Sequence, residues 1–209
     1  MLPDLWRILD RRVRAVRDPL PDVSDLEAGI QHHLDADDWF HADPVFLDGE
    51  RATTAALVGA ELLARHSVMF AHVLWELCLD GALVLREGEG RVRDALREGL
   101  EACSASLPSA AHRHHFARVP RTEDDRARFN ERLAKVSREL AEGSWAFGYA
   151  SGAGLATRID GMRRRVKLLP MNERDLGALA QVAEAQLALA REVVKTIVAS
   201  PPVQRIAAS

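Results

Sequence analysis

Three ionisable side chains recur inside a strongly apolar stretch of the chain. The segment from Val68 to Leu85 reads VMFAHVLWELCLDGALVL, and His72, Glu76 and Asp80 follow one another in it at four-residue spacing. Residues four apart share one face of a helix, and a helix that is apolar on nearly every side is normally buried, so we expect a polar stripe inside a core. A buried carboxylate needs a cation, a hydrogen-bond network or a metal ion, and His with Asp or Glu suits divalent ions. The stripe therefore predicts a metal site.

A second stripe of the same kind lies upstream. In GIQHHLDADDWFH, His33, Asp37 and His41 again fall four residues apart. On a helix the outer two are about 12 Å apart along the axis and roughly 80° apart around it, so neighbours could share one ion whereas the outer pair could not. The two stripes are separated by about 40 residues, the reach of a helical hairpin, which favours one shared intramolecular site. The alternative for each stripe alone is a solvated helix face or a hydrogen-bonded core cluster.

The composition limits the class of protein. A chain of 209 residues predicts a single domain, and its formal net charge of −3 gives no basic field that would recommend nucleic acid as a partner. Cys78 and Cys103 are the only cysteines and form neither a CxxC motif nor a disulfide framework, which indicates a reducing compartment, so we expect the cytoplasm. The N-terminal residues lack the apolar segment of a signal peptide, and the three ionisable groups argue against a membrane span over Val68–Leu85.

The elements that position these side chains are expected to be helices throughout. Ala, Leu, Arg and Glu dominate and no β-branched run alternates in polarity, which predicts an all-α, single-domain bundle of seven or eight helices. Helices are predicted near residues 5–17, 25–41, 49–65, 67–86, 90–104, 123–142, 145–166 and 173–199. Ser24 with Glu27, Thr122 and Asn172 are expected to begin helices, because acidic residues follow each of them. Segment 104–121 is predicted to be one long irregular connection.

Two groups of basic side chains have both a functional and a structural interpretation. The histidines between His112 and Phe116 suggest a metal site, but an irregular loop without a nearby acid favours plain exposure. The arginines near the end of the predicted helix 145–166 could bind phosphate or meet an acidic partner surface, or they could form an exposed helix face. They are Arg158, Arg163, Arg164 and Arg165.

Three segments carry residues whose order is similar to that of one family. The first matches GIxxHRxIDxFTDxHP at Gly29, Ile30, His33, Asp37 and Pro44, with His41 and Asp43 in swapped order. The second runs from Phe70 to Asp80, and the third, SWAFGYASGAGLATRIDGMRRR, carries Trp145, Tyr149, Gly154, Met162 and Arg164 in the family's order. In these respects the chain resembles the acyl carrier protein phosphodiesterases, also called holo-acyl-carrier-protein hydrolases.

The resemblance implies a metal-dependent phosphodiesterase. The family's named activity removes 4′-phosphopantetheine from a serine of acyl carrier protein, and a divalent ion would activate the attacking water. The resemblance points to manganese, while iron, zinc or nickel would also suit such ligands. It implies the metal ligands His33, Asp37, His72 and Glu76. It also implies catalytic roles for Asp4, His41 and Asp80, as further ligands, orienting partners or the general base, and substrate binding by Arg164.

The chain also differs from the family. Leu77 stands where the family has a second His, so the substrate is left open between acyl carrier protein and another phosphoester. Family members carry a His-containing segment before the turn that LPDL matches, and we expect the N-terminus here to be truncated relative to them, since Asp4 would otherwise lie on a fraying end. The alternative function is a noncatalytic helical protein that holds a structural metal or a buried polar network and acts as a binding module.

Overall fold

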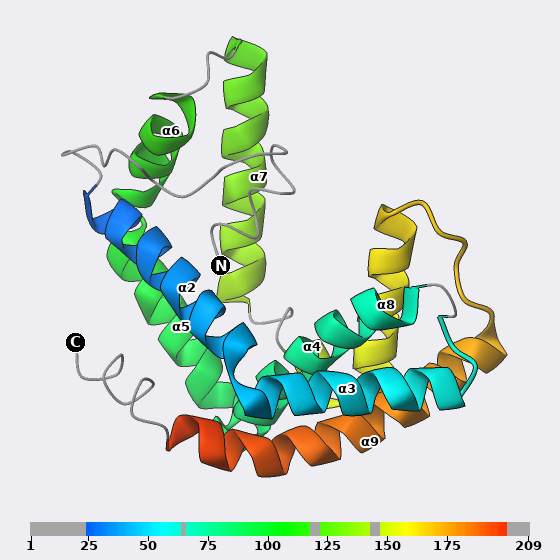
Figure 1. Ribbon diagram of the computed structural model, residues 1–209. Helices are drawn as coiled ribbons and strands as arrows, with labels where there is room; N and C mark the ends of the chain where they lie inside the picture. The colour runs from blue at the N-terminus through cyan, green and yellow to red at the C-terminus, as the bar shows by residue number, and fades with distance from the viewer. Residues whose placement is uncertain (1–23, 64–65, 118–121, 143–146, 200–209) are drawn as a thin grey trace. The chain divides into compact units, whose positions relative to one another are not determined.

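The described part of the chain is mostly helical. A computed structural model describes residues 24–63, 66–117, 122–142 and 147–199 (Figure 1). These residues form α2 (Ser24–Ala42), α3 (Pro44–Gly59), α4 (Ser67–Glu87), α5 (Glu89–Cys103), α6 (Leu107–Ala117), α7 (Glu123–Ala141), the 3₁₀ helix η3 (Phe147–Ala150), α8 (Gly152–Arg165) and α9 (Glu173–Val198). Within those ranges there are eight α-helices and no strand, which confirms the predicted all-α class. Asp4 and the helix predicted at 5–17 lie outside the described residues.

The helices group into two compact units. Unit 1 consists of Met1–Ala42 and Asp94–Glu142, and unit 2 of Asp43–Arg93 and Gly143–Ser209. In their described parts, α2, α6 and α7 belong to unit 1, together with α5 from Asp94 onward, whereas α3, α4, η3, α8 and α9 belong to unit 2. Each unit is described by itself, and a single domain over all 209 residues stays a prediction.

Capping side chains set the starts of three helices. The Thr122 hydroxyl accepts the backbone N–H of Asp125, and the backbone N–H of Thr122 donates to the Asp125 carboxylate, so a reciprocal capping box begins α7 where the sequence predicts a helix start. Asn172 accepts the backbone N–H of Asp175 at 2.8 Å and begins α9 as expected. The start of α3 is five residues earlier than the predicted Gly49, because Asp43 caps it and Pro44 suits the first helical position.

Two predicted segments are wrong in their local structure. The connection 104–121 is not irregular throughout, since α6 occupies Leu107–Ala117, and Pro108 is tolerated there because it lies in the first turn. The single helix predicted at 145–166 is broken. The extended backbone at Ser151 separates η3 from α8. The Ser151 hydroxyl caps α8 by accepting the backbone N–H of Gly154.

Unit 2 is built around α4. This helix packs against α3, α9 and η3, while α8 lies along α9. Two glycines allow the close approaches: a Cβ at Gly49 would lie 2.0 Å from the buried Trp75 indole, and one at Gly81 would lie 2.0 Å from the carbonyl oxygen of Tyr149. The indole of Trp75 therefore fills the space that a side chain on α3 would need, which fixes α3 against α4.

Unit 1 has a smaller described core. Ala111, Phe129 and Leu133 form a buried cluster, against which the partly buried Leu26 packs. This cluster joins α2 and α7 to α6. By contrast, α5 has no fully buried residue, although its sequence is strongly amphipathic.

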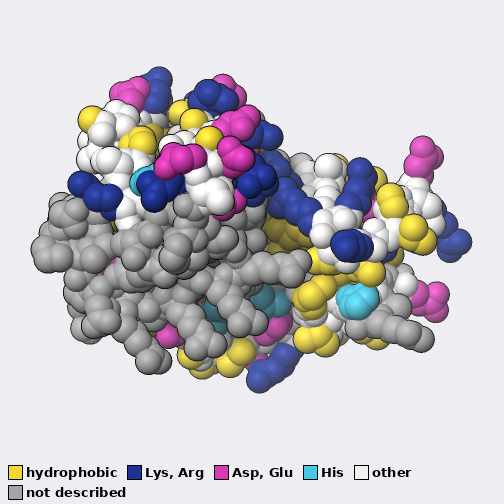
Figure 2. Space-filling model, turned by 90° about the horizontal axis from the view of Figure 1, so that it is seen from above, with side chains coloured by type: hydrophobic (Ala, Val, Ile, Leu, Met, Phe, Trp, Pro, Cys, Tyr) yellow, Lys and Arg dark blue, Asp and Glu magenta, His cyan; other side chains and the backbone are white. Residues whose placement is uncertain are grey.

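Charged side chains on the surface are of mixed sign. In Figure 2, where the described residues form the visible face, Lys and Arg lie among Asp and Glu. Many pair along one helix, as Arg51 does with Asp48 and Arg97 with Asp94. Such exposed ion pairs lie on solvated helix faces and contribute little to the stability of the fold.

One described helix, α4, is long and apolar enough to cross a membrane by length and composition alone. Of its most apolar window, 56% is buried inside the protein, and the core helix of a globular protein passes the same test. The expected absence of a membrane span stays a prediction.

Candidate metal centre

The stripe of His72, Glu76 and Asp80 lies at the edge of the core of unit 2. Helix α4 places the Nε2 atom of His72 3.5 Å from Oε1 of Glu76, one helical turn away. Their side chains are 36% and 34% exposed, and Asp80 is exposed. The prediction of a polar stripe inside the core is therefore wrong. The reason is that α4 buries other faces, with Leu74 and Trp75 fully enclosed, and leaves this stripe along the boundary with solvent.

A third ligand-type residue comes from α3 and was not predicted. Oε1 of Glu50 lies 3.1 Å from Nδ1 of His72, so the imidazole stands between two carboxylates. Glu50 follows Gly49 directly, and the missing side chain at Gly49 is what allows α3 to approach Trp75 closely. The one signal in the sequence is a glycine next to an acid on the neighbouring helix, which is weak without knowledge of the packing.

The ring of His72 is also held by an aromatic neighbour. Phe46 on α3 packs edge-on against it, with the ring centroids 5.3 Å apart. Phe46 is itself 1% exposed, so this contact is anchored in the core. Together with Glu50 it constrains the imidazole plane, and a constrained ring presents its second nitrogen in a fixed direction.

The geometry of the Glu50–His72–Glu76 cluster suits a divalent ion. Metal–nitrogen and metal–oxygen bonds of about 2.0–2.2 Å bring two ligand atoms of one ion to within roughly 3–3.5 Å of each other. The separation of 3.5 Å between His72 Nε2 and Glu76 Oε1 falls in this range. Glu50 would then accept the Nδ1–H of the ring, an arrangement in which an outer carboxylate orients a ligating histidine. The donor set of the cluster therefore fits the ion that the sequence predicts.

The upstream stripe lies in the other unit. His33, Asp37 and His41 all fall on α2, as predicted, and all three are half-buried. The ring centroids of Phe40 and His41 are 5.8 Å apart. Trp39 and Phe40 on the same helix are half-buried. Since α2 belongs to unit 1 and α4 to unit 2, a site shared by both stripes stays a prediction.

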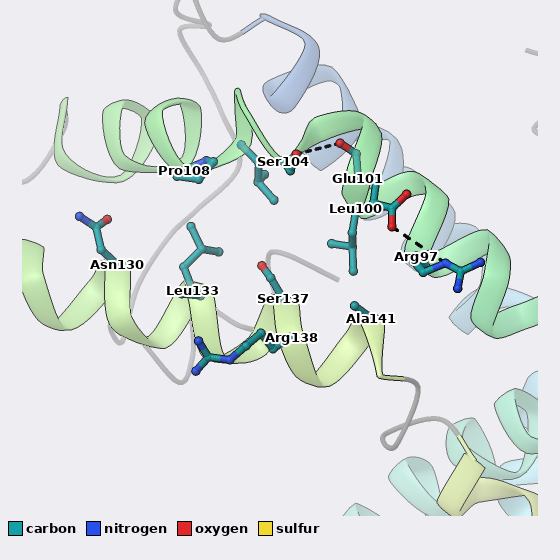
Figure 3. A pocket seen from close by; sticks show the side chains of 12 residues that line it. Arg97, Leu100, Glu101, Ser104, Pro108, Asn130, Leu133, Ser137, Arg138 and Ala141 are labelled. Carbon is teal, nitrogen blue, oxygen red and sulfur yellow. Dashed lines mark hydrogen bonds and ion pairs between the residues drawn. The ribbon is translucent and has the colours of Figure 1, made fainter.

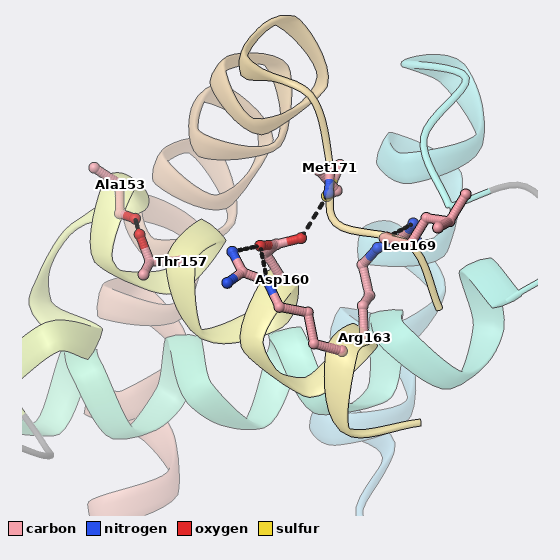
Figure 4. A network of polar contacts seen from close by, with 7 residues as sticks. Ala153, Thr157, Asp160, Arg163, Leu169 and Met171 are labelled. Atoms are coloured by element: carbon pink, nitrogen blue, oxygen red, sulfur yellow. Dashed lines mark hydrogen bonds and ion pairs between the residues drawn. The ribbon is translucent and has the colours of Figure 1, made fainter. Parts of the chain in front are cut away.

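Arg164, the candidate for substrate binding, is held by a buried carboxylate. Its Nε donates to Oδ2 of Asp160 at 2.9 Å and one of its Nη atoms donates to the same oxygen, while the backbone N–H of Met171 donates to Oδ1 at 2.7 Å. Figure 4 shows this network, in which Arg163 also donates to the carbonyl of Leu169. Burial by itself would raise the pKa of Asp160, but the Met171 and Arg164 hydrogen bonds outweigh it and hold that pKa below its ordinary value.

This network gives Arg164 a structural role. It ties the end of α8 to the segment that leads into α9, and the substrate role stays a prediction. Among the other arginines of the group, Arg158 lies over the ring of Tyr149, 5.6 Å from its centroid. Of the other residues in the third matching segment, Met162 is half-buried and Trp145 lies outside the described residues.

The prediction of exposure for the histidines between His112 and Phe116 is wrong at His114. His114 lies on the inner face of α6, and its Nδ1 is 2.6 Å from Oε1 of Glu27 on α2, with both side chains 2% exposed. Glu27 was expected to take part in a helix cap, but here it compensates a buried imidazole. A buried polar pair of this kind is stable only because each partner satisfies the other.

Comparison of the chain with protein family models, with curated proteins and with solved structures finds no match in any of the three.

Proposed function

We propose that the protein binds a divalent cation at the Glu50–His72–Glu76 cluster and hydrolyses phosphoesters there. One observation carries the proposal: an imidazole stands between two carboxylates that come from two tightly packed helices. Ligand-type groups on helices that are fixed by core packing keep the geometry that a metal site requires.

The residues of the cluster have distinct roles in this proposal. Nε2 of His72 and the Glu76 carboxylate hold the ion, and Glu50 fixes the tautomer and plane of the ring. A divalent ion supplies a water of lowered pKa and neutralises charge on a phosphoryl oxygen. The partial exposure of the cluster leaves room for water and a substrate, as a catalytic site requires and a closed structural site does not.

The finer assignments come from the sequence resemblance. His33, Asp37 and His41 would complete the ligand set, Asp80 and Asp4 would orient ligands or act as the base, and Arg164 would bind the phosphate. The substrate would be holo-acyl carrier protein or another phosphodiester in the cytoplasm. Manganese is the ion that the resemblance favours, while zinc, iron and nickel suit the same donor atoms.

A second candidate function is noncatalytic. Both ring nitrogens of His72 already face carboxylates, so the cluster also satisfies itself as a hydrogen-bonded network that joins α3 to α4. In that case the protein would be a binding module whose stripes are structural, and any ion would leave no position open for a substrate.

A metal titration followed by a turnover assay tests the proposal. Calorimetry of the purified chain with Mn²⁺ and Zn²⁺ is expected to give one site that His72→Ala abolishes and that Glu50→Gln weakens about 10- to 100-fold, the usual cost of losing an orienting partner. The rate of hydrolysis of bis(p-nitrophenyl) phosphate with added Mn²⁺ is expected to be lower in each variant than in the wild type, in proportion to the loss of bound metal. Asp48→Asn is the matched control, since Asp48 is an exposed acid on α3 that pairs with Arg51.

The outcomes separate the two candidate functions. Ion binding without turnover favours the binding module, and unchanged binding in His72→Ala with intact helicity removes the cluster from any metal site. His33→Ala and Asp37→Ala, measured in the same way, test the shared site. If both leave affinity and turnover unchanged, the α2 stripe is not part of it.

A further inference from the structure

A hollow in unit 1 has the character of a ligand site. It measures about 430 Å³ and lies between α5, the start of α6 and α7 (Figure 3). Volumes of a few hundred Å³ with largely apolar walls and a few polar groups are typical of small-molecule sites. In Figure 3, Leu100 and Leu133 point into the gap from opposite sides, and the Ser137 hydroxyl points into it between them.

The walls of this hollow explain why α5 buries nothing completely. Its apolar stripe includes Leu96, Leu100 and Cys103, which recur at helical spacing and are all half-buried. An amphipathic helix normally places such a stripe against a partner, yet here part of the stripe faces the hollow. The hollow thus presents apolar surface that a ligand with an apolar body would cover.

The shape of the hollow selects an elongated ligand. On α7 its lining runs from Asn130 to Ala141, which corresponds to about 16 Å of helix. On the opposite side it follows α5 from Arg97 and continues to Pro108 in α6. A slot that is long relative to its volume matches an extended medium-chain alkyl group better than a compact ring system.

The charges at the hollow select an anionic head group. Two arginines and one acid line it, Arg97, Arg138 and Glu101. Arg97 is compensated, since it pairs with Asp94 at 3.1 Å and lies 4.0 Å from Glu101. Arg138 forms no ion pair with any residue in the described part of the chain. A monoanionic group beside Arg138 would supply the missing partner, and guanidinium binds carboxylate well.

We propose that this hollow binds a linear alkyl carboxylate, with the chain between Leu100 and Leu133 and the carboxylate at Arg138. The assignment goes beyond the proposed hydrolase function and uses none of its residues. It gives unit 1 the role of a sensor or carrier for medium-chain acids.

Calorimetry of the full chain with dodecanoate, below its micelle-forming concentration, tests the proposal. Decanoate is expected to bind about 15-fold more weakly, because it lacks two methylenes and each contributes about a fourfold factor. Ala134→Trp, at an exposed position that lines the hollow, is expected to abolish binding. Arg138→Gln is expected to weaken dodecanoate about five- to tenfold and to leave dodecanol unchanged. Lys135→Gln is the matched control on α7, since Lys135 pairs with Glu139 and does not line the hollow.

Three results would overturn the proposal. Dodecanoate fails to bind the wild-type chain, or Ala134→Trp binds it as well as the wild type does, or light scattering shows that the wild-type chain dimerises and that Ala134→Trp makes it monomeric. The last result would assign the hollow to a second copy of the chain. None of these variants touches Glu50, His72 or Glu76, and helicity measured by circular dichroism serves as an independent readout that each variant is folded.

Discussion

Unit 2 and unit 1 are both helical, but they bury their helices to different depths. In unit 2, α4 has eleven buried residues and α9 has six, and glycines at positions 49 and 81 bring backbones and side chains into direct contact. In unit 1, α7 has three buried residues and α5 has none in the described part of the chain. Unit 1 holds a buried acid–imidazole pair and a hollow with largely apolar walls.

The difference separates two kinds of candidate site. A metal cluster needs ligand atoms fixed to within fractions of an ångström, and the close-packed α3–α4 pair of unit 2 supplies that. A site for a flexible alkyl chain needs apolar surface that the protein leaves uncovered, and the incompletely buried α5 supplies that. Packing density therefore decides which chemistry each unit can support.

The largest effect expected from this comparison is at two glycines. Gly81→Ala places a Cβ 2.0 Å from the carbonyl oxygen of Tyr149, so η3 must move, at an expected cost of about 2–3 kcal/mol in the free energy of unfolding. Gly99→Ala on α5 meets nothing within 4 Å and should stabilise the chain by about 0.5–1 kcal/mol, because alanine is the better helix former. Urea unfolding followed by circular dichroism measures both.

These two variants control for each other, since the chemical change is the same and only the unit differs. A loss of similar size at both positions would mean that α5 is packed as tightly as α4. A neutral result at Gly81 would mean that the approach of η3 to α4 is looser than the structure has it.

A smaller effect is expected at two aspartates whose pKa values are lowered. Asp160 in unit 2 is buried and its folded-state pKa lies below the ordinary 3.8, so its hydrogen bonds add stability above that pH. That stability is lost as pH falls through the folded-state pKa, because the unfolded chain takes up the proton first. Asp160→Asn should therefore cost about 2 kcal/mol at neutral pH and progressively less below pH 3.8.

Asp125 in unit 1 is the matched comparison for Asp160. Its pKa is lowered chiefly by the hydrogen bond from the Thr122 hydroxyl at the exposed start of α7, with Arg128 adding to the shift. Asp125→Asn should show the same pH dependence with a smaller amplitude, since solvent screens an exposed cap. Unfolding free energies of both variants between pH 2 and 7 check this, and an equal amplitude at the two sites would contradict it.

The smallest change to the molecule is made by labelling its two cysteines. Burial, with Glu184 nearby, raises the pKa of the Cys78 thiol in unit 2 to about 12, whereas Cys103 in unit 1 is half-buried. A disulfide reagent at pH 8 should therefore modify Cys103 first and Cys78 only when unit 2 opens. Cys103→Ser isolates the slow reaction, and a Cys78 rate close to that of Cys103 would show that unit 2 opens readily.

Local signals in the sequence predicted much of the secondary structure. Thr122 and Asn172 begin their helices as expected, because a capping side chain and its partner lie within three residues of each other. The ends of α3 and the presence of α6 were missed. The prediction did not use Pro44 and Pro108 as signals for the first turn of a helix. In addition, α6 is stabilised by the buried pair of His114 with Glu27, which lies 87 positions away in the sequence.

The candidate site was predicted in part. The four-residue spacing placed His72 and Glu76 on one face of a helix, which follows from helical geometry alone. It could not reveal Glu50, since that contact depends on how close α3 comes to α4, nor the burial of Glu27 with His114.

The sequence by itself determined the helical class, the capped starts of α7 and α9 and the position of each polar stripe on its own helix, because these depend on residues within a few positions of one another. Tertiary structure alone decided which side chains are buried and which carboxylate meets His72 from another helix. Those outcomes depend on the approach of distant segments, and that approach is set by side-chain volume at particular positions, such as the absence of a side chain at Gly49 beside Trp75.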